Sequence, residues 1–239
     1  PDVFDAVSWV LLFDATEETE SDDFGALCVE RIGPAGAACL VFEGGGIENG
    51  VFRLVTARKG RAVFKIVATG KGAHAGVGHR EGASAIVQLA EAVLRVSGLT
   101  DYERGLTVNI GRVEGGLVLN RVAHAAEADG EMRAYDNATL ERGLRGLAEI
   151  DGLSSVASAD GAFRCRTSVG ILRKNPAWPE NEPTNRLLEY YRRAADILGM
   201  KLAAEARGGL SDGNFTWGSI PTIDGLGPDG ANEHCSQRS

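Results

Sequence analysis

The strongest constraint on the fold of this chain is a change of pattern after Arg58-Lys59-Gly60. From there, apolar and polar residues alternate, with Ala62, Phe64, Ile66 and Ala68 set against Lys65 and Thr69. An alternation with a period of two residues is typical of a half-exposed strand in an antiparallel sheet. Because the preceding chain has no such alternation, we expect a second structural unit to begin near residue 60.

The order of elements after this point is also informative. Helical patterns occupy residues 84–96 and 138–150, and strand patterns occupy residues 106–113, 123–135 and 161–172. With the first alternating strand, the order becomes β-α-β-β-α-β, which is the signature of a ferredoxin-like unit. We therefore expect residues 60–172 to form one such unit.

The part before residue 60 has a different pattern, that of an α/β domain. Val7 to Phe13 is a continuous run of β-branched, aromatic and aliphatic residues, which predicts a strand buried on both faces. Ser21 is a good N-cap for a helix over residues 22–32, and Gly33-Pro34 ends it. A second short strand over residues 37–42 would complete a β-α-β unit with a parallel sheet.

The last part of the chain returns to the same α/β pattern. We expect an amphipathic helix over residues 184–200 and a short strand over residues 220–226. The fold class predicted from the sequence is therefore α/β, with residues 1–59 and 173–239 forming one domain that is interrupted by the ferredoxin-like unit.

Composition excludes several classes of protein. The chain of 239 residues has 25 basic and 33 acidic side chains, and the net charge of −8 argues against binding to nucleic acid or to anionic membranes. The longest apolar runs are far shorter than the roughly 20 residues that a membrane span needs. Four cysteines without CxxC spacing favour free thiols in a reducing compartment. We expect a cytoplasmic protein.

The two ends of the chain carry a further expectation. Pro1 stands where an initiator Met would be, no signal-peptide pattern precedes the first apolar run, and the chain ends in a polar stretch. We expect this chain to be an internal piece of a longer protein.

Groups that can bind metal or transfer protons follow three apolar strands of the α/β part. Glu17 and Glu18 follow the first strand, Glu43 follows the second, and His234 lies in the loop beyond the last. Ligands bind at the carboxyl ends of the strands of open parallel sheets, so these groups could converge. Carboxylates and an imidazole suit zinc. In the alternative interpretation, the two adjacent glutamates belong to a solvated acidic turn before a helix N-terminus.

These residues together resemble a known family, the co-catalytic zinc exopeptidases and aminoacylases that include glutamate carboxypeptidase, acetylornithine deacetylase and succinyl-diaminopimelate desuccinylase. The resemblance covers nearly the whole chain and rests on short motifs in a fixed order. These are Asp14–Ser21 (DATEETES), Leu40–Gly45 (LVFEGG), Gly70–Gly76 (GKGAHAG), Asn120, Arg133, Gly208–Phe215 (GGLSDGNF) and Gly225–His234 (GLGPDGANEH).

The resemblance implies a dinuclear zinc centre in the α/β domain, which would be the catalytic domain. Glu17 is similar to the family's general base, Glu18 and His234 to the ligands of one zinc, and Glu43 to a ligand of the other. The family's remaining ligands, a His and a bridging Asp, precede the Glu-Glu element and are not among these residues. We therefore expect this piece alone to bind zinc poorly and the full protein to be the enzyme.

The resemblance also implies roles for residues of the inserted unit and of one turn. His74 is similar to the group that stabilises the oxyanion in a neighbouring subunit, and Asn120, Arg133 and the Gly208-Gly209 turn to the groups that hold a substrate carboxylate. A guanidinium matches a carboxylate in geometry, and glycine lets backbone N–H groups approach an anion. Without the resemblance, the first three would be a loop residue, a turn residue and an exposed cross-strand charge.

The inserted unit is further expected to act as a lid and to form a homodimer. The helix over residues 84–96 and the strand over residues 106–113 are the expected contact surface. The apolar stripe of Val87, Ala90, Val93 and Leu94 is broader than one small sheet needs.

The function implied by the resemblance is a zinc-dependent hydrolase of amide or peptide bonds. It would resemble a glutamate-carboxypeptidase-type exopeptidase that acts on C-terminal residues or on N-acyl amino acids with a free carboxylate. The alternative is a metal-free relative that serves as a binding or dimerisation module. The retention of Glu17, Glu18, Glu43 and His234 argues against this alternative.

Overall fold

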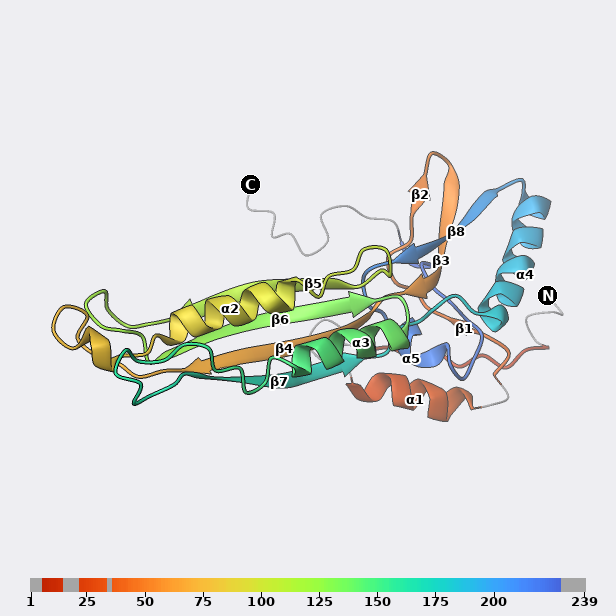
Figure 1. Ribbon diagram of the computed structural model, residues 1–239. Helices are drawn as coiled ribbons and strands as arrows, with labels where there is room; N and C mark the ends of the chain where they lie inside the picture. Colours follow the sequence, from red (N-terminus) through yellow and green to blue (C-terminus); the bar gives the residue numbers. More distant parts are fainter. Residues whose placement is uncertain (1–5, 15–21, 34–35, 229–239) are drawn as a thin grey trace, which may run out of the picture. The chain divides into compact units, whose positions relative to one another are not determined.

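The computed structural model describes residues 6–14, 22–33 and 36–228, and the chain divides into two compact units (Figure 1). One unit consists of Pro1–Lys59 and Trp178–Ser239, and the other of Gly60–Ala177. The chain leaves the first unit once and returns to it once. The predicted fold class, an α/β domain interrupted by an inserted lid, is confirmed.

The inserted unit is a four-stranded antiparallel sheet with two helices on one face (Figure 1). Its main elements, in chain order, are β4 (Gly60–Thr69), α2 (Ala85–Ser97), β5 (Thr107–Gly115), β6 (Ala125–Ala134), α3 (Asn137–Ala148) and β7 (Arg166–Asn175). The strand order β5-β6-β4-β7 is that of a ferredoxin-like fold. It leaves β5 and β7 as the two edges, and a short 3-10 helix, η1 (His79–Glu81), lies in the loop after β4.

The alternation that began at residue 62 gives this unit its core. Phe64 and Ile66 of β4 are fully buried beneath the helices, together with Met132 of β6. Each such side chain contributes about 1.5–3 kcal/mol when it leaves water. The helices begin at side-chain caps, since the Val87 N–H donates to the Ser84 hydroxyl of the cap that precedes α2.

The other face of the sheet carries a network of ion pairs. Lys65 Nζ lies 3.0 Å from a Glu127 oxygen and 3.4 Å from an Asp129 oxygen. Arg112 Nη1 lies 2.9 Å from the other Asp129 oxygen. The hydrogen bond from Arg112, together with the nearby Lys65, holds the pKa of Asp129 below its usual value. Opposite charges on neighbouring strands stabilise the pairing of the sheet on the face that has no helix.

The lowered pKa of Asp129 predicts that acid destabilises the inserted unit. A carboxylate with a depressed folded-state pKa stabilises the fold above its unfolded pKa of about 3.9, and this contribution is lost as the pH falls through the folded-state value. Between pH 5 and pH 3, Asp129→Asn should therefore show a shallower decline of thermal stability than the wild type. The exposed Glu103→Gln is the control and should follow the wild-type pH profile, and an unchanged profile in Asp129→Asn would contradict the assignment.

The α/β unit contains two small sheets and three helices within the described residues. Its elements are α1 (Asp22–Ile32), β1 (Cys39–Leu40), β2 (Ile47–Glu48), β3 (Val51–Arg58), α4 (Glu182–Leu198), β8 (Lys201–Arg207), α5 (Gly213–Thr216) and β9 (Thr222–Ile223). Strand β1 pairs with β9, and β3 pairs with β8, both in parallel. Leu54, Leu188 and Ile223 form a core between β3, α4 and β9. No helix in the described ranges is long and apolar enough to span a membrane.

One predicted strand is wrong. Residues 7–13 belong to no strand, and Leu11 and Phe13 are 77% and 88% exposed. A strand buried on both faces needs partners, and none of the described strands pairs with this segment. The short strands predicted at residues 37–42 and 220–226 are present but reduced to two residues each.

Strands β2, β3 and β8 were not predicted. The β2–β3 hairpin has a recognisable signal, because Asn49 and Gly50 both have positive φ angles, as a type I′ turn requires. Strand β8 has no comparable local signal, because its partner β3 is separated from it in the sequence by the whole inserted unit.

Candidate functional site

Glu43 is the described member of the predicted metal ligands. It follows β1, and the Gly227 N–H donates to its backbone oxygen at 2.8 Å. Because β1 and β9 are parallel neighbours, the segment that continues toward His234 leaves the sheet beside Glu43. Glu17, Glu18 and His234 lie outside the described residues, so their convergence with Glu43 stays a prediction. Within residues 6–14, 22–33 and 36–228, no group of three or more His, Cys, Asp or Glu side chains could hold a metal ion.

Two glycines allow the close backbone approach beside Glu43. A Cβ at Gly45 would lie 2.4 Å from the Gly227 oxygen, and a Cβ at Gly227 would lie 2.5 Å from the Phe42 oxygen and 2.6 Å from the Glu43 oxygen. The Arg207 guanidinium donates to the Gly44 oxygen at 2.6 Å and holds the same loop from β8. The position of the Glu43 backbone therefore depends on glycine at these two positions.

This packing predicts that Gly227→Ala displaces the Glu43 loop. The added methyl group would clash with backbone atoms, which cannot rotate away as a side chain can, so thermal stability should fall. Gly218→Ala is the matched control, because a Cβ there meets no atom within 4 Å. Equal melting temperatures of the two variants, measured by circular dichroism, would show that this close approach does not constrain the Glu43 loop.

The Gly208-Gly209 turn is held by a buried ion pair. Arg58 Nε lies 2.7 Å from an Asp224 oxygen, and the two side chains are 5% and 0% exposed. Arg58 Nη1 also donates to the Gly209 oxygen at 3.1 Å, and the Ser211 hydroxyl donates to Asp224 at 2.6 Å. The pair therefore joins the end of β3, the turn after β8 and the residue that follows β9.

Breaking this pair should destabilise the α/β unit strongly. Asp224→Asn leaves the Arg58 guanidinium buried without a counter-ion, which typically costs about 3–5 kcal/mol. The exposed pair of Arg53 and Glu48 provides the control, since exposed ion pairs contribute little. Urea denaturation should therefore show a large loss of stability for Asp224→Asn and a small one for Glu48→Gln, and similar losses would contradict this account.

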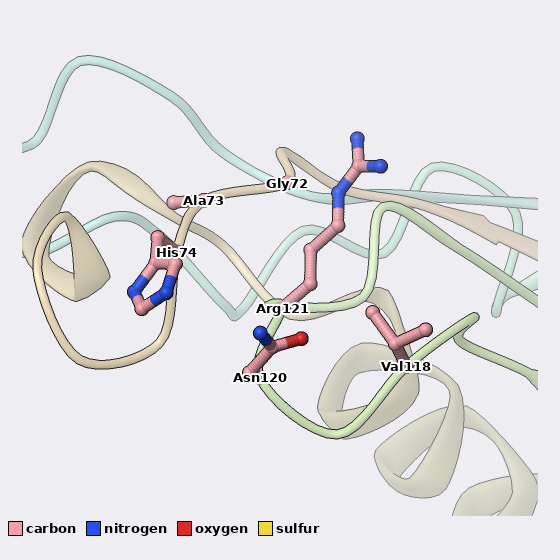
Figure 2. A pocket seen from close by; sticks show the side chains of 6 residues that line it. All are labelled: Gly72, Ala73, His74, Val118, Asn120 and Arg121. Carbon is pink, nitrogen blue, oxygen red and sulfur yellow. The ribbon is translucent and has the colours of Figure 1, made fainter.

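Two of the predicted site residues of the inserted unit lie together. His74 is in the loop after β4 and Asn120 in the loop between β5 and β6, and these loops pair through the Ala75 N–H, which donates to the Asn120 oxygen at 2.9 Å. Both residues line a pocket of about 270 Å³ (Figure 2). The lining residues are Gly72, Ala73, His74, Val118, Asn120 and Arg121.

One hydrogen bond defines the tautomer of His74. The Gly76 N–H donates to His74 Nδ1 at 3.1 Å, so the neutral ring carries its proton on Nε2. The His74 side chain is exposed. An N–H on Nε2 is the kind of donor that stabilisation of an oxyanion requires.

Arg133 lies at the opposite end of the same sheet. On β6, Arg133 pairs with Arg61 of β4 and Thr107 of β5, close to the points where the chain enters and leaves the unit. Ala125, the first residue of β6, lies at the other end of the strand, near the loop that carries His74. At about 3.4 Å per residue, the eight steps from Ala125 to Arg133 span about 27 Å. Arg133 donates to both oxygens of Glu131, at 2.8 and 3.2 Å. The structure therefore does not bring Arg133 to Asn120 within one inserted unit.

Sequence reasoning missed Arg121 in the His74 pocket. The sequence did carry one signal, because Arg121 directly follows the predicted site residue Asn120. The structure shows that Arg121 pairs across from His74 and lines the same pocket.

The surface predicted for dimerisation is apolar and exposed. Val87 and Leu94 of α2 are 56% and 74% exposed, Ala90 is exposed between them, and Val93 is partly buried. Strand β5 is an edge strand of the sheet, and most of its side chains are exposed.

Comparisons with known proteins identify relatives of both units. Residues 56–150 match the model of the peptidase dimerisation domain of the M20 family. The uncharacterized protein YqjE of Bacillus subtilis is 26% identical over 178 residues, 74% of this chain and 46% of that protein. A probable carboxypeptidase of Aspergillus terreus is 42% identical over 95 residues, 34% of this chain and 21% of that protein.

A solved structure also has this fold. The crystal structure of aminopeptidase PepT from Bacillus cereus matches with a TM-score of 0.63 and 25% identity, covering 82% of this chain and 53% of that one. The chain thus spans about half the length, or less, of the relatives that it matches.

Proposed function

Because residues 56–150 match the peptidase dimerisation domain of the M20 family, we propose that this chain belongs to that family and is part of a zinc-dependent hydrolase of amide or peptide bonds. The substrates would be C-terminal residues of peptides or N-acyl amino acids with a free carboxylate. The observation that carries the proposal is the pocket that His74 and Asn120 line together, in which Nδ1 of His74 already accepts the Gly76 N–H. The peptidase dimerisation domain match supports the same class of enzyme.

The predicted metal ligands of the α/β unit suit two zinc ions. Of these three ligands, Glu43 lies within the described residues, and Glu18 and His234 lie outside them. Glu18 and His234 would hold one ion and Glu43 the other, since carboxylates and imidazole are ordinary zinc ligands. The ions would supply Lewis-acid polarisation of the substrate carbonyl. Glu17 would take a proton from the attacking water and return it to the leaving amine. The backbone contact between Glu43 and Gly227 supports the expected approach of Glu43 and His234.

The active site in this proposal is shared between two subunits. His74 and Asn120 lie at one end of the lid, and Arg133 and the chain connections to the catalytic domain lie at the other. About 27 Å separates the two ends along the sheet, so one lid cannot place both groups on one small substrate. A homodimer removes this difficulty if His74 stabilises the oxyanion in the site of the partner subunit.

The dimer contact in this proposal uses α2 and β5. The exposed apolar stripe of Val87, Ala90 and Leu94 would be buried against the same stripe of a second copy. Pairing of two β5 edges would satisfy backbone groups that an isolated edge leaves to water.

A mixing experiment with the full-length, zinc-loaded protein tests the composite site. His74→Ala and Glu17→Gln homodimers should each lose nearly all hydrolysis of an N-acyl amino acid, because each site lacks either the oxyanion donor or the base. After subunit exchange, half of the dimers are hybrids with one intact site, so about a quarter of wild-type activity should return.

The control mixes His74→Ala with the double variant His74→Ala/Glu17→Gln, which leaves no intact site in any dimer. No recovery in the test mixture, with exchange verified by mass spectrometry, would show that His74 acts within its own subunit or not at all. A full-length protein that neither retains zinc nor hydrolyses any N-acyl amino acid would favour the binding or dimerisation module instead.

A further inference from the structure

The His74 pocket contains a cation for which the proposed enzyme has no assigned use. Arg121 lines this pocket, pairs across from His74 and is exposed. Among the described residues, no carboxylate forms an ion pair with its guanidinium. A guanidinium that lines the same pocket as His74 and Asn120 favours an anionic ligand.

Gly72 makes room for this guanidinium. A Cβ at Gly72 would lie 2.8 Å from Arg121 Nε and 2.9 Å from Nη2. Figure 2 shows the Arg121 side chain extended past Gly72, with the His74 ring at the other end of the pocket. The backbone of Gly72 therefore supports the guanidinium on one side and limits the loss of side-chain freedom when a ligand binds.

Arg133 is poorly suited to the same task. Glu131 accepts hydrogen bonds from Nε and Nη2 of Arg133, and Arg61 Nε lies 2.7 Å from the same carboxylate. Burial alone would raise the pKa of Glu131, but Arg133 and Arg61 hold it below its usual value. A substrate carboxylate would have to displace Glu131 from Arg133, whereas it would displace only water from Arg121.

The charge around the pocket has the sign that an anion needs. The loops at this end of the unit, residues 70–84, 116–124 and 154–166, contain Lys71, Arg80, Arg121, Arg164 and Arg166 against Glu81 and Asp160. In a chain with a net charge of −8, this excess of cations is local. A local positive region attracts anionic ligands from solution.

We propose that Arg121, at the His74 end of the lid, is a carboxylate-binding residue, in place of Arg133 at the opposite end. The ligand would be a small carboxylate with an apolar substituent, because Val118 lines the pocket and is itself 59% exposed. The identification of that ligand as a substrate rests on the proposed function, but the binding does not.

Binding of 4-phenylbutanoate and 4-phenylbutanamide to the full-length protein tests this assignment by isothermal titration calorimetry. The two ligands differ in charge but hardly in shape, and neither contains an internal amide bond. The wild type should bind the carboxylate about tenfold or more tightly than the amide, as a charge-assisted bidentate pair implies. Arg121→Gln should remove this preference and leave amide binding unchanged, and Arg121→Lys should retain part of it.

Arg145→Gln, an exposed arginine of α3 that does not line the pocket, is the matched control and should keep the full preference for the carboxylate. The proposal is overturned if the wild type shows no preference, if Arg121→Gln keeps it, or if Arg133→Gln removes it while Arg145→Gln keeps it. Hydrolysis of N-benzoylglycine by the zinc-loaded protein is measured separately. A protein that binds 4-phenylbutanoate through Arg121 and hydrolyses nothing would refute the proposed function and leave this inference standing.

Discussion

The buried ion pair between Arg58 and Asp224 organises the α/β unit. Arg58 is the last residue of β3, and the chain reaches the inserted unit two residues later. The same guanidinium holds the turn at Gly209, and the backbone of Arg58 pairs with that of Trp178, where the chain returns. Two charges removed from water need each other, so every segment that contributes to the pair is restrained by it.

The inserted unit is organised by a different constraint, the division of one sheet into two faces and two ends. One face is covered by α2 and α3, and the other is held by ion pairs among lysine, arginine and carboxylate side chains. One end connects to the α/β unit, and the other carries the paired loops with His74, Asn120 and Arg121. The candidate pocket of this unit therefore lies at the end of the sheet that is opposite to the chain connections.

Glycine determines where backbones can approach one another at both candidate sites. Beside Glu43, Gly45 and Gly227 allow two chain segments to meet at distances that a Cβ would prevent. At the His74 pocket, Gly72 has the same role toward the Arg121 side chain. The high glycine content of the sequence thus has a structural reason at positions beside the candidate site residues.

The sequence by itself determined the inserted unit almost completely. The alternation of apolar and polar residues in β4 and the spacing of apolar residues in α2 and α3 are local patterns. Each pattern predicts which face of its element is buried. The sequence also pointed to Asn120 and His74, whose roles stay predictions, and their meeting in one pocket depends on how two loops pair.

Only the tertiary structure decided the rest. The pairing of β3 with β8, the ion pair of Arg58 with Asp224 and the distance between Arg133 and Asn120 all join residues that are remote in sequence or in space. Residues 7–13 show the same limit, since their apolar character predicts burial but cannot supply the neighbouring strand that burial requires. Local patterns specify what a segment can become, and long-range contacts decide which partner it finds.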